Sequence, residues 1–267
     1  MAVCYRHSNR ETGVSCSNCG NPICPDCMTP TPVGMRCPEC AKQKTKVRRG
    51  AAAMTAGGDP VVTIGLIALN VLVFIGMSAQ GGIGSAQGHI YINYCLFGPL
   101  VHDEPYRLLT GGFLHSGLLH IGFNMYILWF LGQMLEPALG PFRFAALYFG
   151  ALLAGSFGAV LVTPHSPTVG ASGAIFGLMG AAFVMQYARG IDPMQSGIGP
   201  IILLNLAISL IPGLNISIGG HIGGLIGGAI AGFLMDQAVQ RRLPLLVSMA
   251  PCLAVGAIGV AGAFAVT

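Results

Sequence analysis

Two polar residues that could act together as a nucleophile and a base lie in apolar stretches of this 267-residue chain. Ser172 stands between glycines in Gly170-Ala-Ser-Gly173, and His221 lies in the apolar run of residues 216–235. Ionisable side chains are rare within a bilayer and are usually functional there. A serine hydroxyl activated by a histidine is a hydrolytic nucleophile, so the pair predicts hydrolysis inside a membrane.

The residues around each group favour this chemistry. Gly170 and Gly173 allow a tight turn into a helix, which would place Ser172 at the helix N-terminus, where free N–H groups suit an oxyanion. His221 shares one helix face with Gly224 and Gly228, and these glycines would let a second helix approach closely. The alternatives are structural: a small residue at a helix interface for the serine, and a cross-helix hydrogen bond for the histidine.

A third polar pair, His120-x-x-x-Asn124, falls on one face of another apolar segment. Both side chains can donate hydrogen bonds to an oxyanion. The alternatives are a polar contact between helices or a metal site. The metal site is disfavoured because His115 and Glu136, the remaining candidates beside His221, lack recognisable ligand spacing.

No carboxylate is expected as a third catalytic member. Asp103 and Glu104 lie in a loop, and Glu136 lies at the far end of its apolar segment. The sequence therefore predicts a Ser–His dyad with an added oxyanion hole. Phe176, four residues after Ser172, lies on the same helix face and is placed to stack on the histidine.

The composition indicates that helices in a bilayer position these groups. The chain is 53% hydrophobic and 8% charged, whereas soluble domains carry roughly 25% charged residues. Seven apolar segments follow the polar N-terminal part, at residues 61–77, 118–135, 144–162, 172–187, 199–211, 219–235 and 245–266. A span needs about 20 residues, so the fourth and fifth are short and suit helices that start part-way through the membrane. The predicted fold class is an all-α polytopic membrane protein.

The basic residues predict the orientation. Eight of the 13 Lys and Arg residues precede residue 50, several of them in the run 42–49. The positive-inside rule therefore places the N-terminus in the cytoplasm. With seven spans, each later loop that contains basic residues lies in the cytoplasm, except the loop of Arg107. The C-terminus then lies outside. Ser172 and His221 would share a depth near the outer surface.

Together these motifs resemble those of the rhomboid family of intramembrane serine proteases. The matching residues are Gly170-x-Ser172-Gly173 for GxSG, His221-x-x-Gly224-x-x-x-Gly228 for HxxGxxxG, and His120-x-x-x-Asn124 for HxxxN. They lie in the family's order on the second, fourth and sixth spans. The resemblance covers residues 61–235, a six-span core, and the last span resembles the extra helix of "six plus one" members.

The resemblance implies a role for each of these residues. Ser172 would be the nucleophile and His221 the base. His120, Asn124 and the backbone N–H of Ser172 would form the oxyanion hole, and Phe176 would stack beneath the histidine. A membrane-embedded first loop would support the core, and the fifth helix would gate access of substrate.

The first loop departs from the family pattern at one position. The family's Trp-Arg pair reads Tyr106-Arg107 here. Arg107 is retained as a supporting residue, with tyrosine as the aromatic substitute. The departure concerns the packing of this loop more than catalysis.

The N-terminal part carries a different chemistry. Its four pairs of metal-ligand type are Cys4-x-x-His7, Cys16-x-x-Cys19, Cys24-x-x-Cys27 and Cys37-x-x-Cys40. This spacing, in a module expected in the reducing cytoplasm, predicts two structural zinc ions rather than disulfides. Chain order leaves the pairing open. We favour a cross-brace, with one ion on Cys4, His7, Cys24 and Cys27 and the other on Cys16, Cys19, Cys37 and Cys40.

This module resembles B-box, RING-like and zinc-ribbon folds. Because so small a module lacks a sufficient core, the metal would supply most of its folding energy. The expected organisation is a zinc-binding module at 1–41, a basic linker at 42–59, a six-span core at 60–237 and a seventh helix at 238–267.

The predicted function is an intramembrane serine endopeptidase of the plasma membrane that needs no cofactor for catalysis. Its expected partners are transmembrane protein substrates and the lipid bilayer; nucleic acid is not expected. The role of the zinc module is open: it could bind a cytoplasmic protein, sense redox or zinc state, or regulate the protease. One alternative is a non-proteolytic rhomboid-like binder or chaperone of membrane proteins, although such relatives usually lack the serine or the histidine. A transporter is disfavoured because the sequence shows no internal repeat.

Overall fold

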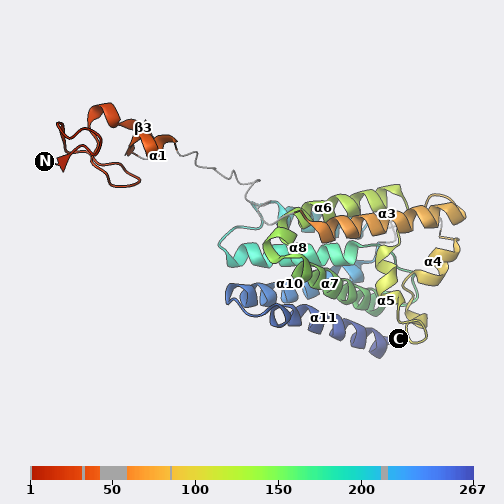
Figure 1. Ribbon diagram of the computed structural model, residues 1–267. Helices are drawn as coiled ribbons and strands as arrows, with labels where there is room; N and C mark the ends of the chain where they lie inside the picture. Colours follow the sequence, from red (N-terminus) through yellow and green to blue (C-terminus); the bar gives the residue numbers. More distant parts are fainter. Residues whose placement is uncertain (1, 32–33, 43–58, 85, 212–215) are drawn as a thin grey trace. The chain divides into compact units, whose positions relative to one another are not determined.

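The computed structural model describes residues 2–31, 34–42, 59–84, 86–211 and 216–267. The chain divides into two compact units, Met1–Ala51 and Ala52–Thr267 (Figure 1). The predicted basic linker falls at this division, and all of it except Lys42 and Asp59 lies outside the described residues.

The N-terminal unit is built from very short elements. It contains the antiparallel pairs β1 (Ala2–Val3) with β2 (Glu11–Thr12) and β3 (Thr29–Thr31) with β4 (Gly34–Arg36), the 3-10 turn η1 (Pro25–Cys27) and helix α1 (Pro38–Lys42). Its core consists of six buried cysteines and Ile23, with Met28 packed against them. A core with so little aliphatic area cannot stabilise a fold by itself, so this unit needs cross-links or metal ions.

In the part of the second unit that the structure describes, an apolar helix lies over each of the seven segments predicted from the sequence. These helices are α3 (Val61–Gly81), α6 (Leu118–Leu139), α7 (Pro141–Val162), α8 (Ser172–Ala188), α9 (Ile198–Ser209), α10 (Ile218–Gln240) and α11 (Leu245–Val266). Five of them are long and apolar enough to cross a membrane, while α8 and α9 are shorter. The 17 residues of α8 rise about 26 Å and the 12 of α9 about 18 Å, against a hydrocarbon core of about 30 Å. The predicted all-α polytopic membrane fold is confirmed.

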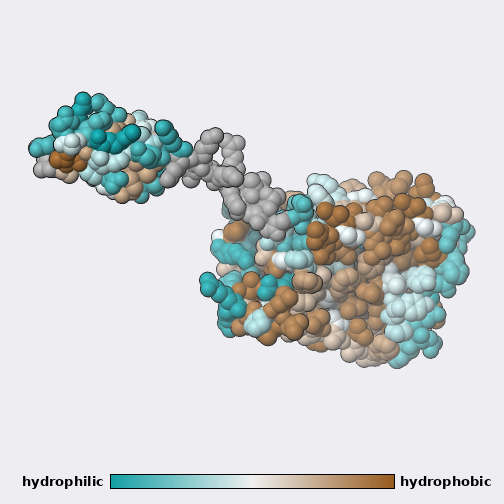
Figure 2. Space-filling model, in the orientation of Figure 1, coloured by the Kyte–Doolittle hydropathy of each residue, from teal (hydrophilic) through white to brown (hydrophobic). Residues whose placement is uncertain are grey.

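The surface of this unit matches a bilayer. Figure 2 shows apolar residues across its middle, with hydrophilic residues gathered toward its ends. Large apolar side chains such as Leu72, Phe123, Leu204 and Leu246 are exposed on the outer faces of the helices. Such a belt would be unstable in water and is what lipid contact requires. The chain is therefore an integral membrane protein.

Helices α7, α8 and α10 pack closely together, and α11 lies against α7 and α10 (Figure 1). Glycines set the spacing of α8 and α10. A Cβ at Gly224 would lie 2.0 Å from the carbonyl oxygen of Gly173, and one at Gly228 would lie 2.2 Å from that of Gly177. Only glycine permits this approach, which brings the starts of the two helices together.

The first helix of this unit is held at its N-terminus by a buried carboxylate. Glu136 on α6 accepts hydrogen bonds from the backbone N–H groups of Val62 and Thr63, each at 2.8 Å, and from the Thr63 hydroxyl at 2.6 Å. These are N–H groups that the first turn of α3 cannot satisfy internally. Glu136 is thus a helix cap and is not free for metal binding or catalysis.

Candidate active site

The serine lies at the start of α8. Ala171 is the N-cap residue and Ser172 the first helical residue, so its N–H has no partner within the helix. Gly170, just before, has a φ of +126°, which side chains on L-residues rarely adopt. A Cβ at Gly170 would also lie 2.7 Å from His120 Nε2. The sequence therefore needs glycine at 170 to turn the chain into α8 beside His120.

His221 meets this serine from α10. The helix begins at Ile218 after the N-cap Ser217, whose side chain accepts a hydrogen bond from the Gly220 N–H at 3.2 Å. His221 Nε2 lies 2.8 Å from Ser172 Oγ. This is hydrogen-bond distance for transfer of the hydroxyl proton to the imidazole.

Phe176 fixes the plane of the imidazole. It lies one turn after the serine on α8, and its ring stacks on that of His221, with the centroids 4.1 Å apart and the planes 22° apart. The imidazole is 6% exposed, so it is shielded from bulk water. Ring stacking and burial together restrict the imidazole to one orientation.

The other ring nitrogen of His221 has a partner that the sequence analysis missed. Ser209, the last residue of α9, has its Oγ 2.7 Å from His221 Nδ1. The same hydroxyl is 2.7 Å from the carbonyl oxygen of Asn205, to which it donates. The signal was available: Ser209 and Asn205 are polar residues one turn apart in a short apolar helix.

No carboxylate contacts His221 in the part of the chain that the structure describes. Asp236, a buried acid that the sequence analysis did not weigh, lies 15 residues further along α10, or about 22 Å. It forms an ion pair with Arg189 at 2.6 Å and accepts a hydrogen bond from Gln240 at 2.7 Å. Asp236 is therefore engaged in an ion pair and is remote from His221.

His120 faces the serine turn from α6. Its Nε2 lies beside Gly170, as does Ser172 Oγ, which would be 3.7 Å from a Cβ at that position. Its Nδ1 lies 3.3 Å from the backbone N–H of Ser116 and 3.1 Å from the Ser116 hydroxyl. Because a backbone N–H can only donate, Nδ1 accepts and the proton of the neutral imidazole sits on Nε2. His120 therefore presents an N–H donor toward the serine turn.

Two further residues line this side of the site. Asn124 is buried and donates one amide N–H to the carbonyl of His120 at 2.8 Å, which leaves its second amide N–H for another acceptor. His115 is fully buried with its ring 5.0 Å from that of His120. Neither nitrogen of His115 has a hydrogen-bond partner among the described residues.

Gly173 is less constrained than the other glycines of the site. A Cβ there would meet Gly155 and Gly220 at 3.5 Å, an ordinary contact distance. The tighter position here is Gly224 opposite it, where a Cβ would lie 2.0 Å from the Gly173 carbonyl oxygen. The supporting role predicted for Gly173 therefore falls on its backbone.

The long loop between α3 and α6 supports the serine turn from the side. It contains α4 (His89–Tyr94) and α5 (Arg107–Thr110), and it does not form a span. Backbone hydrogen bonds join Leu96 and Thr168 in both directions, at 3.0 and 2.8 Å, and the Gly170 N–H donates to the Gly111 carbonyl at 2.9 Å. The chain leading to Ser172 is thus fixed to this loop.

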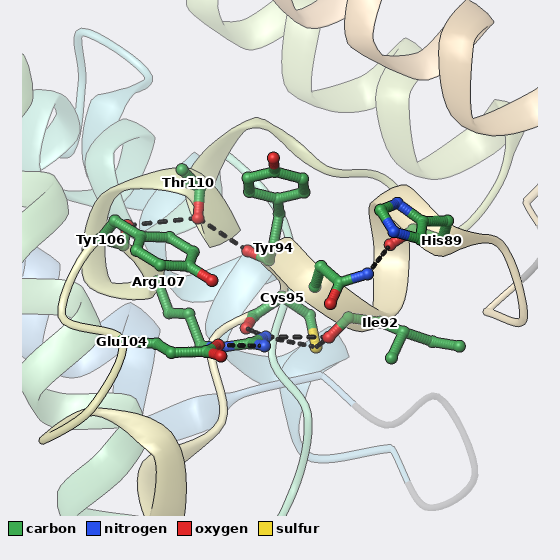
Figure 3. Close-up of polar contacts among 9 residues, drawn as sticks. His89, Ile92, Tyr94, Cys95, Glu104, Tyr106, Arg107 and Thr110 are labelled. Carbon is green, nitrogen blue, oxygen red and sulfur yellow. Dashed lines mark hydrogen bonds and ion pairs between the residues drawn. The ribbon is translucent and has the colours of Figure 1, made fainter.

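Arg107 holds the loop together (Figure 3). It is 2% exposed, and its guanidinium donates to the carbonyls of Ile92 at 2.9 Å and Cys95 at 2.8 Å. It also forms an ion pair with Glu104, and this hydrogen-bonded contact lowers the pKa of the Glu104 carboxyl. Tyr106, the substitute for the family's tryptophan, packs its ring against Tyr94 with centroids 5.8 Å apart.

The N-terminal unit gathers its eight ligand-type residues into two clusters. One contains Cys4, His7, Cys24 and Cys27, and the other contains Cys16, Cys19, Cys37 and Cys40. These are the two sets of the cross-brace. The nine cysteines of the chain are free thiols, and the Cys19 and Cys37 sulfurs are 3.8 Å apart, far beyond a disulfide bond of about 2.05 Å.

The spacing of the ligand atoms fits a tetrahedral metal ion. His7 Nδ1 lies 3.3 Å from Cys24 Sγ, 3.4 Å from Cys27 Sγ and 3.9 Å from Cys4 Sγ. Ideal tetrahedral zinc would set nitrogen–sulfur separations of about 3.5 Å and sulfur–sulfur separations of about 3.8 Å. Backbone N–H groups also point at sulfur, as from Cys37 to Cys16 Sγ at 3.3 Å. Both clusters could hold a metal ion.

Comparison with known proteins places this geometry in context. Residues 102–238, which contain the whole serine and histidine constellation, match a family model described as the Rhomboid domain. The chain is 34% identical over 177 residues to the rhomboid protease GluP of Bacillus subtilis (strain 168), covering 65% of this chain and 34% of that protein.

Two other relatives carry different descriptions. The chain is 32% identical over 123 residues to rhomboid-type serine protease 2 of Emericella nidulans, covering 42% of this chain and 24% of that protein. It is 41% identical over 80 residues to the inactive RHOMBOID-like protein 8 of Arabidopsis thaliana, covering 30% of this chain and 23% of that protein. The chain thus spans about a third or less of the length of each of these curated relatives.

Proposed function

Because the chain belongs to the rhomboid family, we propose that it is an intramembrane serine endopeptidase with Ser172 as nucleophile and His221 as general base. The observation that carries the proposal is the 2.8 Å contact between Ser172 Oγ and His221 Nε2 in a half-buried site. A hydroxyl and an imidazole at this distance form the minimal unit for acyl transfer.

In the proposed reaction, Ser172 Oγ attacks the scissile carbonyl carbon as its proton passes to His221 Nε2. The carbonyl oxygen becomes an oxyanion, which the N–H groups of Ser172, His120 and Asn124 stabilise. The imidazolium then gives its proton to the leaving amine as the C–N bond breaks. Water, deprotonated by His221, hydrolyses the acyl-enzyme and returns Ser172 to its starting state.

The proposed substrates are transmembrane helices of other membrane proteins. An intact helix hides its carbonyls in hydrogen bonds, so a cut requires local unwinding, which favours small or helix-breaking residues near the scissile bond. The proposed orientation follows the positive-inside rule, with a cytoplasmic N-terminus and a site that opens outside, in the plasma membrane. Two of the relatives are named as proteases, which supports this class of activity.

The competing proposal is a rhomboid-like binder that holds membrane proteins without cutting them. One relative is named as inactive, so membership of the family does not decide between the two. A binder needs no proton path between Ser172 and His221, whereas a protease does. The contact between these side chains therefore favours the protease.

The test is cleavage of a fluorogenic single-span substrate by the full chain in liposomes. Ser172→Ala and His221→Ala should each lower kcat by at least about 1,000-fold. Ser248→Ala is the matched control, since this buried serine on α11 bonds Arg143 at 2.6 Å, and it should cleave at the wild-type rate. Cleavage that survives in either site variant, or substrate binding without cleavage by the wild type, would reject the protease.

We further propose that the N-terminal module, residues 1–41, holds two structural zinc ions, one in each cluster. Bound zinc would supply folding energy to a unit whose described core consists mainly of cysteines and Ile23. The eight side chains would serve as ligands in their deprotonated forms. A cytoplasmic protein is the proposed partner of the folded module.

Metal analysis of the purified full chain tests the zinc proposal. We expect two zinc ions per chain, and about one after Cys16→Ser with Cys19→Ser, which removes two ligands of one cluster. Replacing the unclustered Cys252 with Ser is the control and should leave two. A wild-type content near zero, or a different metal, would contradict the assignment.

A further inference from the structure

We infer that Ser209 is a positioning residue that holds His221 in the tautomer required of a general base. This inference rests on the proposed function, since it assigns a role to the contact behind the proposed base. It begins from the one hydrogen bond of the imidazole that the Ser172–His221 dyad does not use, between His221 Nδ1 and Ser209 Oγ at 2.7 Å.

The direction of that hydrogen bond follows from the second contact of the hydroxyl. Ser209 Oγ also lies 2.7 Å from the carbonyl oxygen of Asn205. A carbonyl can only accept, and a serine hydroxyl has one proton, so the proton of Ser209 points to Asn205. If the Ser209 hydroxyl donated to His221 Nδ1 instead, its oxygen and the Asn205 carbonyl oxygen would lie at hydrogen-bond distance with no proton between them. This would occur at a residue that is only 8% exposed.

The tautomer of the imidazole is then determined. Because the Ser209 hydroxyl donates its hydrogen bond to the Asn205 carbonyl, its oxygen must accept one from His221. Nδ1 of His221 therefore carries the hydrogen. The lone pair of the neutral ring is left on Nε2, which faces Ser172 Oγ at 2.8 Å. A continuous chain of donors and acceptors thus runs from the Ser172 hydroxyl through the imidazole and Ser209 to the Asn205 carbonyl.

This arrangement does with a neutral group part of what a buried carboxylate does in a triad. A carboxylate fixes the tautomer and also stabilises the imidazolium by its charge. A hydroxyl fixes the tautomer and offers only a dipole, but it avoids an extra charge in a low-dielectric site. The expected contribution is therefore that of one hydrogen bond, about tenfold in rate.

The contact also makes a third helix part of the site. The nucleophile comes from α8, the base from α10 and Ser209 from the end of α9. Within α9 the buried residues are Ile198, Gly199, Ile202 and Ser209. The helix therefore has a small packing contact with the rest of the bundle. Correct orientation of the base consequently depends on the position of α9 at Ser209.

A pair of variants with the same shape isolates the hydroxyl. Ser209→Thr keeps it and Ser209→Val removes it, while both add the same branching at Cβ. We expect the valine variant to lower kcat by about tenfold relative to the threonine variant, with KM within twofold, because substrate contacts are unchanged. Thr163→Ala is a control for loss of a hydroxyl-to-carbonyl bond within a helix, since Thr163 bonds Ala159 at 3.2 Å, and it should leave kcat unchanged.

A second measurement reports the tautomer independently of cleavage. Nitrogen NMR of histidine-labelled full chain should show His221 protonated at Nδ1 in the wild type, and a mixture of tautomers in Ser209→Val. Equal kcat for the threonine and valine variants, or a wild-type His221 protonated at Nε2, would overturn the inference. If the proposed function fails, so that Ser172→Ala cleaves like the wild type, the tautomer measurement still decides whether Ser209 positions the ring.

Discussion

At the scale of single residues, polar groups in apolar segments are the basis of the proposed site. Ser172, His221 and His120, all chosen for their type and spacing, come together around Gly170. Ser116 and Ser209 were missed because each contacts the Nδ1 atom of a histidine, the ring nitrogen on the side away from Ser172. Their roles depend on which segment lies behind each ring, and neighbours in sequence do not determine that.

His120 is the proposed side-chain donor to the oxyanion. His120→Ala should lower kcat by about 100-fold and leave KM within a few-fold, because the donor acts on charge that develops only in the transition state. Ser116→Ala should cause a smaller loss in the same direction, since the Ser116 N–H still reaches His120 Nδ1 at 3.3 Å. Steady-state kinetics on the fluorogenic substrate measures both. An effect on KM alone would assign His120 to substrate binding.

The two glycines of the GxSG motif should differ in their sensitivity. Gly170→Ala places a Cβ 2.7 Å from His120 Nε2 at a φ of +126°, so it should lower kcat by about 100-fold through displacement of the serine turn. Gly173→Ala meets only ordinary contacts at 3.5 Å and should cost no more than a few-fold. Kinetics and melting temperatures of the two variants provide the comparison. Equal losses would show that the motif is constrained by something other than these contacts.

At the scale of elements, the apolar pattern predicted the seven apolar helices that the structure describes in the membrane unit, including the two shorter ones, α8 and α9. Length and hydropathy suffice for this because a bilayer leaves few alternatives to a helix. The short helices α4 and α5 were not predicted. They depend on the guanidinium of Arg107, which reaches carbonyls 12 and 15 residues away in the chain. Such contacts form only once the loop is folded.

The cap on α3 carries a prediction for stability. Glu136→Ala removes the acceptor for three donors, two backbone N–H groups and the Thr63 hydroxyl, and should lower the free energy of unfolding by about 3 kcal/mol. Glu136→Gln keeps one oxygen acceptor, so its free energy of unfolding should lie between those of the alanine variant and the wild type. Unfolding titrations with SDS in mixed micelles measure the difference. Wild-type stability of the alanine variant would show that α3 is held by packing alone.

At the scale of the whole molecule, the chain joins two units with separate means of stabilisation. The membrane unit buries a large apolar core, whereas the described core of the N-terminal unit is formed mainly by cysteines of its two ligand clusters. The sequence indicated both, since ligand spacing and hydropathy are local properties. The sequence analysis also favoured the cross-brace pairing. In the structure, Cys4 and Cys24 lie in one cluster, as that pairing requires.

Removal of metal should affect the two units differently. A strong chelator should unfold the N-terminal unit, seen as loss of dispersed amide signals from residues 2–31, because its core holds little beyond cysteine. Cleavage by the membrane unit should persist, since the proposed nucleophile, base and oxyanion donors all lie within residues 102–238. Loss of cleavage on chelation, restored by added zinc, would show instead that the module controls the protease.

The proposed function requires Ser172 to be a nucleophile activated by His221. Its most direct test is reaction of the full chain in liposomes with a fluorophosphonate, followed by mass spectrometry of the modified peptide. We expect one covalent adduct, on Ser172, that forms at least about 100-fold more slowly in His221→Ala. No adduct in the wild type, an adduct on another serine, or equal labelling without the histidine would contradict it.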